Sequence, residues 1–141
     1  MLDEGQDRAE VVRQCLAIGY ERLVGELAGG IAAWRSAGLP VATVALVTAD
    51  DVVGTVVDVR QRSEFDAEHV PDALNVELGD TAEQASALPP GPLTVMCGHG
   101  ERAMSAVSIL ATRGRTDVAV LVGGPGDVVA ARSTRSQSLV E

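Results

Sequence analysis

The sequence predicts an α/β domain whose central parallel sheet is covered by helices on both faces, preceded by a short additional segment. Candidate strands alternate with candidate helices through residues 41–132, as in successive βαβ units. Of the 141 residues, 46% are hydrophobic and only 2% aromatic, so the core must consist mainly of Val, Ala, Leu and Ile, which favours buried parallel strands. A chain of this length can bury one ordinary core with a small addition.

Short apolar runs between turn residues mark the strands. Residues 55–59 read Thr-Val-Val-Asp-Val, and residues 93–96 read Leu-Thr-Val-Met before a glycine-rich turn. The expected strands are residues 44–47, 55–59, 73–76, 93–96 and 118–122.

Helical patterns fill the segments between these strands. The best defined covers residues 102–113, where apolar side chains recur at helical spacing. Residues 133–141, rich in Ser, Arg and Gln, are expected to form a loose tail. The other expected helices are residues 49–53, 62–68 and 81–87, and a short one from Asp127 after the disturbance by Pro125-Gly126.

Residues 1–40 predict a helix, a short strand and a second helix, without a sheet of their own. The first helix spans residues 7–18 and places Cys15 in its apolar core-facing stripe, the strand spans residues 22–27, and the second helix spans residues 31–37. Residues 18–30 and 113–124 share a pattern of helix end, strand and double glycine. We interpret residues 1–40 as the closing fragment of a repeat whose complete copy, residues 41–132, follows.

The charge balance excludes several classes of partner. Eleven basic residues against twenty acidic ones give a formal charge of −9, which repels nucleic-acid phosphates and anionic lipids. No signal peptide or membrane-spanning run is evident, so a cytoplasmic protein is expected. Cys15 and Cys97 are expected to be reduced thiols. With His69 and His99 as the only histidines and no ligand motif, neither a metal nor an organic cofactor is expected.

Cys97 is the candidate nucleophile. It ends the strand at residues 93–96 and precedes a tight turn and a helix, so several backbone N–H groups converge on its thiol at the positive end of a helix dipole. This arrangement and the positive charge of Arg102 should lower the pKa of the thiol. Because Arg102 opposes the dipole of its own helix, it needs an anionic partner, which is either substrate or a carboxylate.

The neighbouring residues carry supporting roles. Gly98 and Gly100 allow the turn that points the amides inward. His99 and Glu101 lie at the loop tip, where they either tune substrate choice or are exposed without a role.

Two further supporting residues end the neighbouring strand. Asp58 is expected to brace the loop and Arg60 to form a structural ion pair.

Five motifs in order resemble those of rhodanese domains, over residues 41–131. The resemblance implies a rhodanese-like α/β fold, a Cys97 persulfide, and a substrate-binding loop that reaches Ala103, where the family often has Ser. The implied activity moves sulfane sulfur from thiosulfate or a persulfide to a thiol or cyanide. Related phosphatases have a loop one residue longer, so sulfur is preferred to phosphate or arsenate chemistry. The motifs are Asp58-Val59-Arg60, Glu64-Phe65, residues 69–76, residues 97–102 and Leu121-Val122-Gly123-Gly124.

Residues 19–34 resemble the degenerate rhodanese repeat of metallo-β-lactamase and rhodanese fusion proteins. This implies the C-terminal part of such a fusion or of a tandem rhodanese protein. The alternative function is therefore a non-catalytic module that binds or regulates a fused hydrolase. The partners to consider are a small sulfur-containing anion or persulfide, a thiol acceptor, and a second copy of the chain or a partner domain in a longer chain, through an unpaired strand edge in residues 1–40.

Overall fold

The computed structural model describes residues 5–17 and 21–138 and divides into two compact units, residues 1–43 and 44–141. The boundary lies three residues after the one expected from the sequence. The two units are described separately below.

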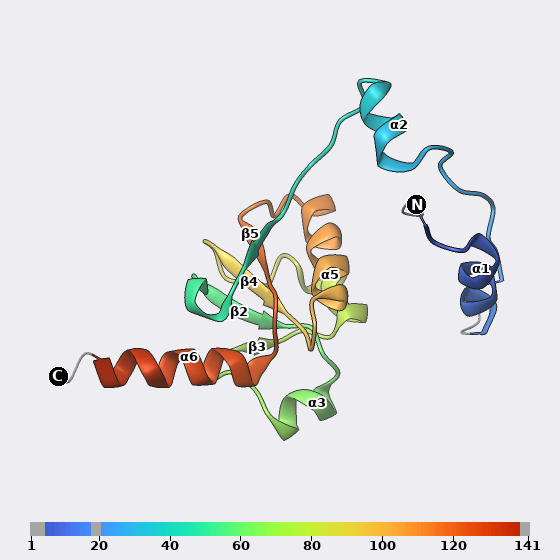
Figure 1. Cartoon of the computed structure of the whole chain (residues 1–141). Helices are drawn as coiled ribbons and strands as arrows, with labels where there is room; N and C mark the ends of the chain where they lie inside the picture. The colour runs from blue at the N-terminus through green and yellow to red at the C-terminus, as the bar shows by residue number, and fades with distance from the viewer. Residues whose placement is uncertain (1–4, 18–20, 139–141) are drawn as a thin grey trace. The chain divides into compact units, whose positions relative to one another are not determined.

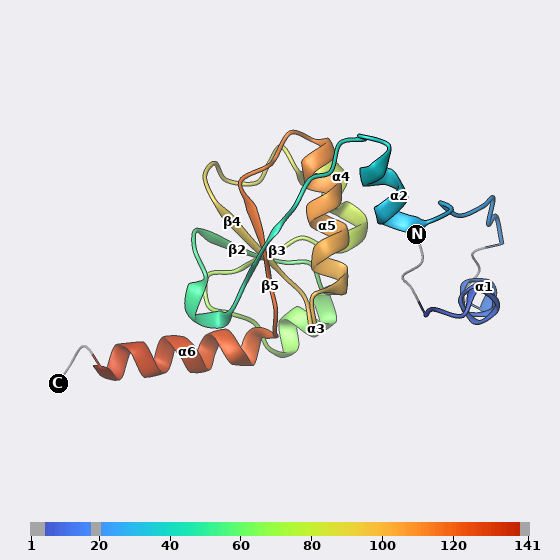
Figure 2. The same cartoon turned by 45° about the horizontal axis from the view of Figure 1, so that its top comes forward.

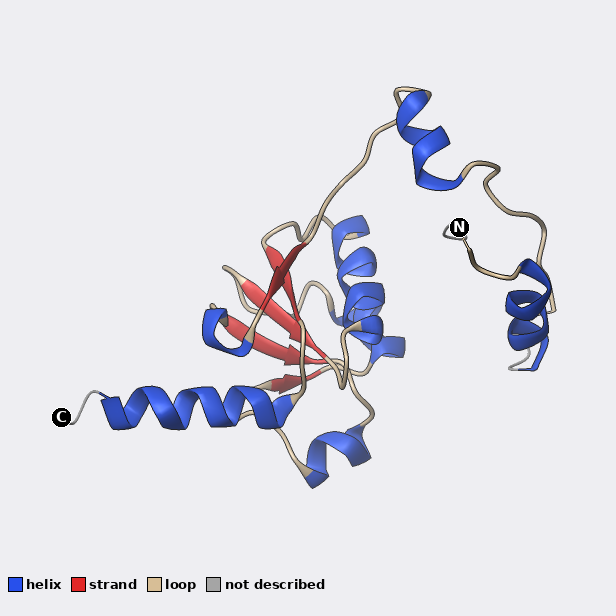
Figure 3. Cartoon of the chain, viewed as in Figure 1, coloured by secondary structure: helices blue, strands red, loops and turns tan. Residues whose placement is uncertain are grey.

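The second unit contains a five-stranded parallel sheet with the order β1-β5-β4-β2-β3 (Figures 1 and 3). All four neighbouring pairs are parallel, which confirms the predicted α/β class. All four residues of β4 are buried, because it lies between β5 and β2 at the centre of the sheet. The strands are β1 (Ala45–Val47), β2 (Thr55–Asp58), β3 (Leu74–Asn75), β4 (Leu93–Met96) and β5 (Val118–Leu121).

One face of the sheet is covered by α4 (Thr81–Gln84) and α5 (Glu101–Thr112), which lie side by side in Figure 2. Alternation along the strands directs Val57, Val95 and Val120 toward this face. Helix α5 meets them with residues that are mostly small and are all buried, so helix and sheet pack closely. These α5 residues are Ala103, Ala106, Val107 and Leu110.

The opposite face is covered by the 3₁₀ turn η1 (Ala49–Asp51) and the start of α6 (Pro125–Ser138). The intervening strand residues Val56, Met96 and Leu121 pack here with Val128 of α6. Helices therefore cover both faces, as predicted. Two further elements, α3 (Arg62–Ala67) and η2 (Leu78–Asp80), complete the unit.

Helix α6 differs from its prediction at both ends. It begins at Pro125, because proline suits the first helical position, where its missing N–H is not needed. It continues to Ser138, so residues 133–138 are helical rather than a loose tail. The guanidinium of Arg135 donates to the Asp50 carbonyl at 2.6 Å, which anchors this half of the helix. Residues 139–141 of the expected tail lie outside the described residues.

The first unit contains α1 (Arg8–Ala17) and α2 (Gly30–Ser36). The predicted strand at residues 22–27 is wrong: residues 21–27 are irregular, since a strand needs a hydrogen-bonded neighbour. Cys15 is half-buried and α1 has no buried residue, so the predicted core position of Cys15 is also wrong. The predicted helix end at Ile18-Gly19, and the start of the segments resembling a repeat, lie outside the described residues.

No helix in the described parts of the chain combines the length and the hydrophobicity needed to cross a bilayer.

Candidate functional site

Cys97 follows β4 directly, at the carboxyl end of the central strand. Residues 97–100 form the turn that leads into α5. Carboxyl ends of parallel strands are the usual location of ligand sites in such sheets. The Cys97 residue is only 1% exposed, so its thiol lies beneath the loop rather than on its surface.

Backbone N–H groups of the loop and of the first turn of α5 surround the Cys97 sulfur. The N–H of Gly100 donates to Sγ at 3.0 Å. Burial raises the pKa of the Cys97 thiol, but hydrogen bonds from the N–H groups of Ala103, His99, Gly100 and Arg102 lower it by more, so it lies below its ordinary value. The site therefore favours a thiolate, which is the nucleophilic form of cysteine.

Gly100 makes this arrangement possible through its backbone. Its φ of 114° lies in a region that other residues rarely adopt. A Cβ at this position would lie 3.9 Å from the Leu121 carbonyl oxygen, at ordinary contact distance. The torsion angle, rather than lack of space, therefore requires glycine here. Gly98 has no such torsion and lies beside the Arg102 guanidinium.

Arg102 pairs with a carboxylate that the sequence did not identify as part of the site. Its two terminal nitrogens donate to Glu64 of α3 at 2.6 and 3.0 Å. The Arg102 guanidinium lowers the pKa of Glu64 to about 2, and Glu64 also accepts a hydrogen bond from the Gln61 N–H. Hydrogen bonding to Glu64 raises the pKa of Arg102, with a smaller contribution from the Cys97 sulfur. The available signals were the need of Arg102 for an anion and the Glu64-Phe65 motif.

Asp58 and Arg60 form a buried ion pair at the end of β2. Asp58 is fully buried and Arg60 is 7% exposed, with a shortest N–O distance of 2.7 Å. The guanidinium also donates to the Glu68 carbonyl at 2.6 Å. Within the described residues, the hydrogen bonds of the Asp58 carboxylate go to Arg60 and none to residues 97–102. Any support from Asp58 to the loop is therefore indirect, through the pairing of β2 with β4.

The remaining predicted contact residues divide into two kinds. His99 and Glu101 are exposed, and neither side chain bonds to another described residue. Ala103 is buried and offers its backbone N–H to the sulfur. Gly124, after β5, lies close to the loop, because a Cβ at this position would be 3.5 Å from the Gly98 carbonyl oxygen. Within the described residues, no group of His, Cys, Asp and Glu side chains is arranged to hold a metal ion.

The family model of the Rhodanese-like domain matches residues 42–130 of the chain. The chain belongs to this family. A curated relative, the thiosulfate sulfurtransferase GlpE of Pseudomonas savastanoi, is 36% identical over 69 residues, which cover 48% of this chain and 65% of the relative. The match thus spans slightly less than two thirds of that relative's length.

Solved structures support the same fold for the rhodanese-like domain. A Helicobacter pylori protein solved by NMR superimposes with a TM-score of 0.53 at 25% identity, covering 61% of this chain and 83% of that one. A rhodanese-related protein from Thermoplasma volcanium gives 0.55 at 24% identity, covering 61% and 91%.

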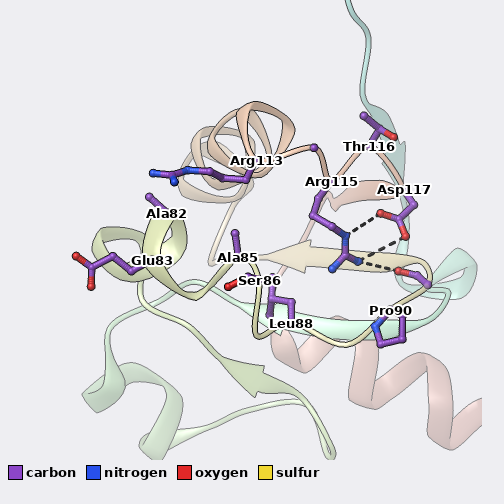
Figure 4. A pocket seen from close by; sticks show the side chains of 12 residues that line it. Ala82, Glu83, Ala85, Ser86, Leu88, Pro90, Arg113, Arg115, Thr116 and Asp117 are labelled. Atoms are coloured by element: carbon purple, nitrogen blue, oxygen red, sulfur yellow. Dashed lines mark hydrogen bonds and ion pairs between the residues drawn. The ribbon is translucent and has the colours of Figure 1, made fainter.

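A cavity of about 930 Å³ lies at the other end of the rhodanese-like domain (Figure 4). Its lining includes Glu83 of α4 and Arg113 at the end of α5, while Arg115 and Asp117 form an ion pair before β5. These residues precede the strands, so the cavity lies at their amino ends and Cys97 at their carboxyl ends. The cavity is therefore separate from the candidate active site.

Proposed function

We propose that the rhodanese-like domain is a sulfurtransferase that carries sulfane sulfur on Cys97. The observation that carries this proposal is the buried Cys97 sulfur surrounded by four backbone N–H donors, with its pKa below the ordinary value. A thiolate held by fixed dipoles is a ready nucleophile, and the same donors stabilise negative charge on the product.

In the first step, the Cys97 thiolate attacks the sulfane sulfur of a donor. A bond forms between Sγ and that sulfur while the donor's own sulfur–sulfur bond breaks. The bonding electron pair leaves with the donor remnant, which is sulfite from thiosulfate or a thiolate from a persulfide. Cys97 becomes a persulfide, and no external oxidant is needed.

In the second step, an acceptor thiolate or cyanide attacks the terminal sulfur of the Cys97 persulfide. The sulfur–sulfur bond to Sγ breaks, and its electron pair returns to Sγ. Cys97 is again a thiolate, and the product is a new persulfide or thiocyanate. Throughout, the N–H groups of residues 99, 100, 102 and 103 face the charged sulfur.

Arg102 and Glu64 act as a unit beside this chemistry. Arg102 places positive charge next to Cys97, and the bidentate pair with Glu64 fixes the orientation of the guanidinium. We assign Arg102 to the site and Glu64 to its positioning.

The comparison with GlpE supports sulfur transfer as the reaction class, whereas the physiological donor and acceptor belong to this proposal. The alternative of a non-catalytic module is less favoured, because N–H groups that converge on a cysteine sulfur and stabilise its thiolate favour nucleophilic chemistry, which a binding module does not need. A fusion with a hydrolase stays a prediction from residues 19–34.

Thiocyanate formation from cyanide tests the proposal. The chain should form thiocyanate with thiosulfate, methanethiosulfonate or a small persulfide as donor. Cys97→Ser should abolish the reaction, and Cys15→Ser, the matched control in the first unit, should retain it. Absence of thiocyanate with every donor, or equal activity in Cys97→Ser, would overturn the proposal.

A further inference from the structure

We propose that the Cys97 site selects donors carrying a single negative charge, as persulfides do, over the thiosulfate dianion, and that Glu101 sets this preference. The inference rests on the proposed sulfurtransferase function and names its substrate class. Three features of the described residues carry it: the pairing of the arginines, the unpaired charge of Glu101, and the depth of the thiol.

The arginines near Cys97 are already neutralised. Arg102 gives both terminal nitrogens to Glu64. Arg60, which lies within electrostatic range of Glu64 and Arg102, is held by Asp58 and by the Glu68 carbonyl. A dianion entering this cluster therefore meets no arginine that lacks a carboxylate partner. Its charge would have to be balanced by backbone dipoles.

The backbone N–H dipoles of the loop already interact with the Cys97 sulfur. The Gly100 N–H donates directly to Sγ, and the N–H groups of His99, Arg102 and Ala103 also face the sulfur. They stabilise one negative charge, which moves to the terminal sulfur when Cys97 becomes a persulfide. Thiosulfate adds a second and a third negative charge to that of the Cys97 thiolate, and these charges would compete for the same N–H donors.

Glu101 adds a negative charge at the loop itself. It lies between Gly100 and Arg102, whose N–H groups both face the Cys97 sulfur. Its side chain is exposed, and no described residue pairs with it. Asp127, whose carboxylate accepts the Gly124 N–H at 2.9 Å, adds a carboxylate beside the loop, because Gly124 packs against Gly98. The field at the entrance is therefore unfavourable to anions, and most of all to dianions.

The burial of Cys97 adds to the preference for persulfides over thiosulfate. At 1% exposure, the donor must bring its sulfane sulfur beneath the loop. In thiosulfate that sulfur is bonded directly to the sulfonate, so the charged head must follow it closely. In a persulfide the next atom is a divalent sulfur on a narrow chain. With a Cys97 thiolate, the reacting groups carry three negative charges with thiosulfate and two with an ionised persulfide.

Two donors of nearly equal shape isolate the effect of charge. Methanethiosulfonate replaces one charged oxygen of thiosulfate with a methyl group and so has one negative charge fewer. We would measure kcat/KM for both with the full chain, at low ionic strength and again in high salt. The readout is the thiosulfate to methanethiosulfonate ratio in wild type, Glu101→Gln and the control Glu83→Gln. Comparing ratios removes the intrinsic difference in reactivity between the two donors.

Glu83→Gln is a matched control because it removes the same charge from an exposed carboxylate beside the distant cavity (Figure 4). We expect Glu101→Gln to raise the ratio about threefold at low salt, with Glu83→Gln unchanged and the effect lost in high salt. The persulfide of 2-mercaptoethanol should behave as methanethiosulfonate does: the ratio of kcat/KM for thiosulfate to kcat/KM for this persulfide should also rise in Glu101→Gln. If Glu101 merely stabilised α5, its loss would lower Tm and leave the ratio unchanged.

An unchanged ratio in Glu101→Gln, or an equal rise in Glu83→Gln, would overturn the inference and leave sulfur transfer standing. Failure of all three donors to load Cys97 would instead overturn the proposed function, and this inference with it.

Discussion

The guanidinium of Arg102 and the carboxylate of Glu64 form a bidentate ion pair, with N–O distances of 2.6 and 3.0 Å. The pair joins the first turn of α5 to α3, two segments that are 38 positions apart in the sequence. Both side chains are 38% exposed. The pair thus fixes the position of the Arg102 guanidinium beside Cys97, at the accessible rim of the site.

Changes to this pair should move the pKa of Cys97 in opposite directions. Arg102→Gln removes a cation and should raise the pKa, whereas Glu64→Gln removes an anion and should lower it. Each change should alter the thiolate fraction near neutral pH by about threefold. The pH dependence of iodoacetamide alkylation, in a Cys15→Ser background, measures it. Arg113→Gln, which removes an exposed arginine at the distant cavity, is the control and should leave the pKa of Cys97 unchanged. Shifts of the Cys97 pKa in the same direction in Arg102→Gln and Glu64→Gln would contradict the account.

The ion pair of Glu64 with Arg102 should persist until the pH falls below the ordinary pKa of a glutamate side chain. The pKa of Glu64 is lowered from 4.5 to about 2 in the folded chain. Its stabilisation is therefore fully present above the unfolded value and disappears as the pH falls toward about 2. The difference in urea midpoint between wild type and Glu64→Gln should be constant from about pH 7 to about pH 5.5 and shrink at lower pH. A difference that grows on acidification would contradict this assignment.

The strands and the nucleophile could be predicted from the sequence because local pattern determines them. Residues 93–96 form β4 as predicted, and Cys97 follows it in a glycine turn. The partner of Arg102 could not be predicted, because the sequence shows the need for an anion but not which distant carboxylate meets it. The length of α6 was missed for the same reason: Arg135 reaches the Asp50 carbonyl across 85 positions.

The errors in the first unit have a different cause. Residues 22–27 have the apolar character of a strand, but pairing depends on a neighbour that local pattern does not reveal. Cys15 recurs at helical spacing with apolar residues, yet α1 buries none of them. Periodicity predicts a helix well, whereas burial depends on what covers it.

Gly100→Ala should impair the site through the backbone. The positive φ of Gly100 is strained for alanine, so we expect a stability loss of about 1 kcal/mol and a higher Cys97 pKa as the N–H groups move. Gly114→Ala is the matched control, because its φ of 82° carries similar strain at the far end of α5. Thermal unfolding measures the stability loss in both variants, and the pH dependence of alkylation measures the pKa of Cys97, which should rise in Gly100→Ala and stay unchanged in Gly114→Ala. An unchanged Cys97 pKa in Gly100→Ala would show that loop geometry does not set it.

Asp58→Asn should act on stability rather than on chemistry. It leaves the buried Arg60 guanidinium without its counter-charge, at a cost of about 3 kcal/mol. Urea unfolding measures the loss, and replacing both residues with apolar ones should recover part of it. Cys97 in the folded fraction should still alkylate normally. A loss of Cys97 reactivity at unchanged stability would instead place Asp58 in direct support of the loop.

Intact mass of the reduced chain, before and after exposure to methanethiosulfonate or a small persulfide, tests sulfur transfer most directly. We predict the gain of one sulfur atom in wild type and in Cys15→Ser, its absence in Cys97→Ser, and its removal by cyanide with formation of thiocyanate. A Cys97 thiol that takes up no sulfur from any donor, or an adduct that persists in Cys97→Ser, would contradict the account.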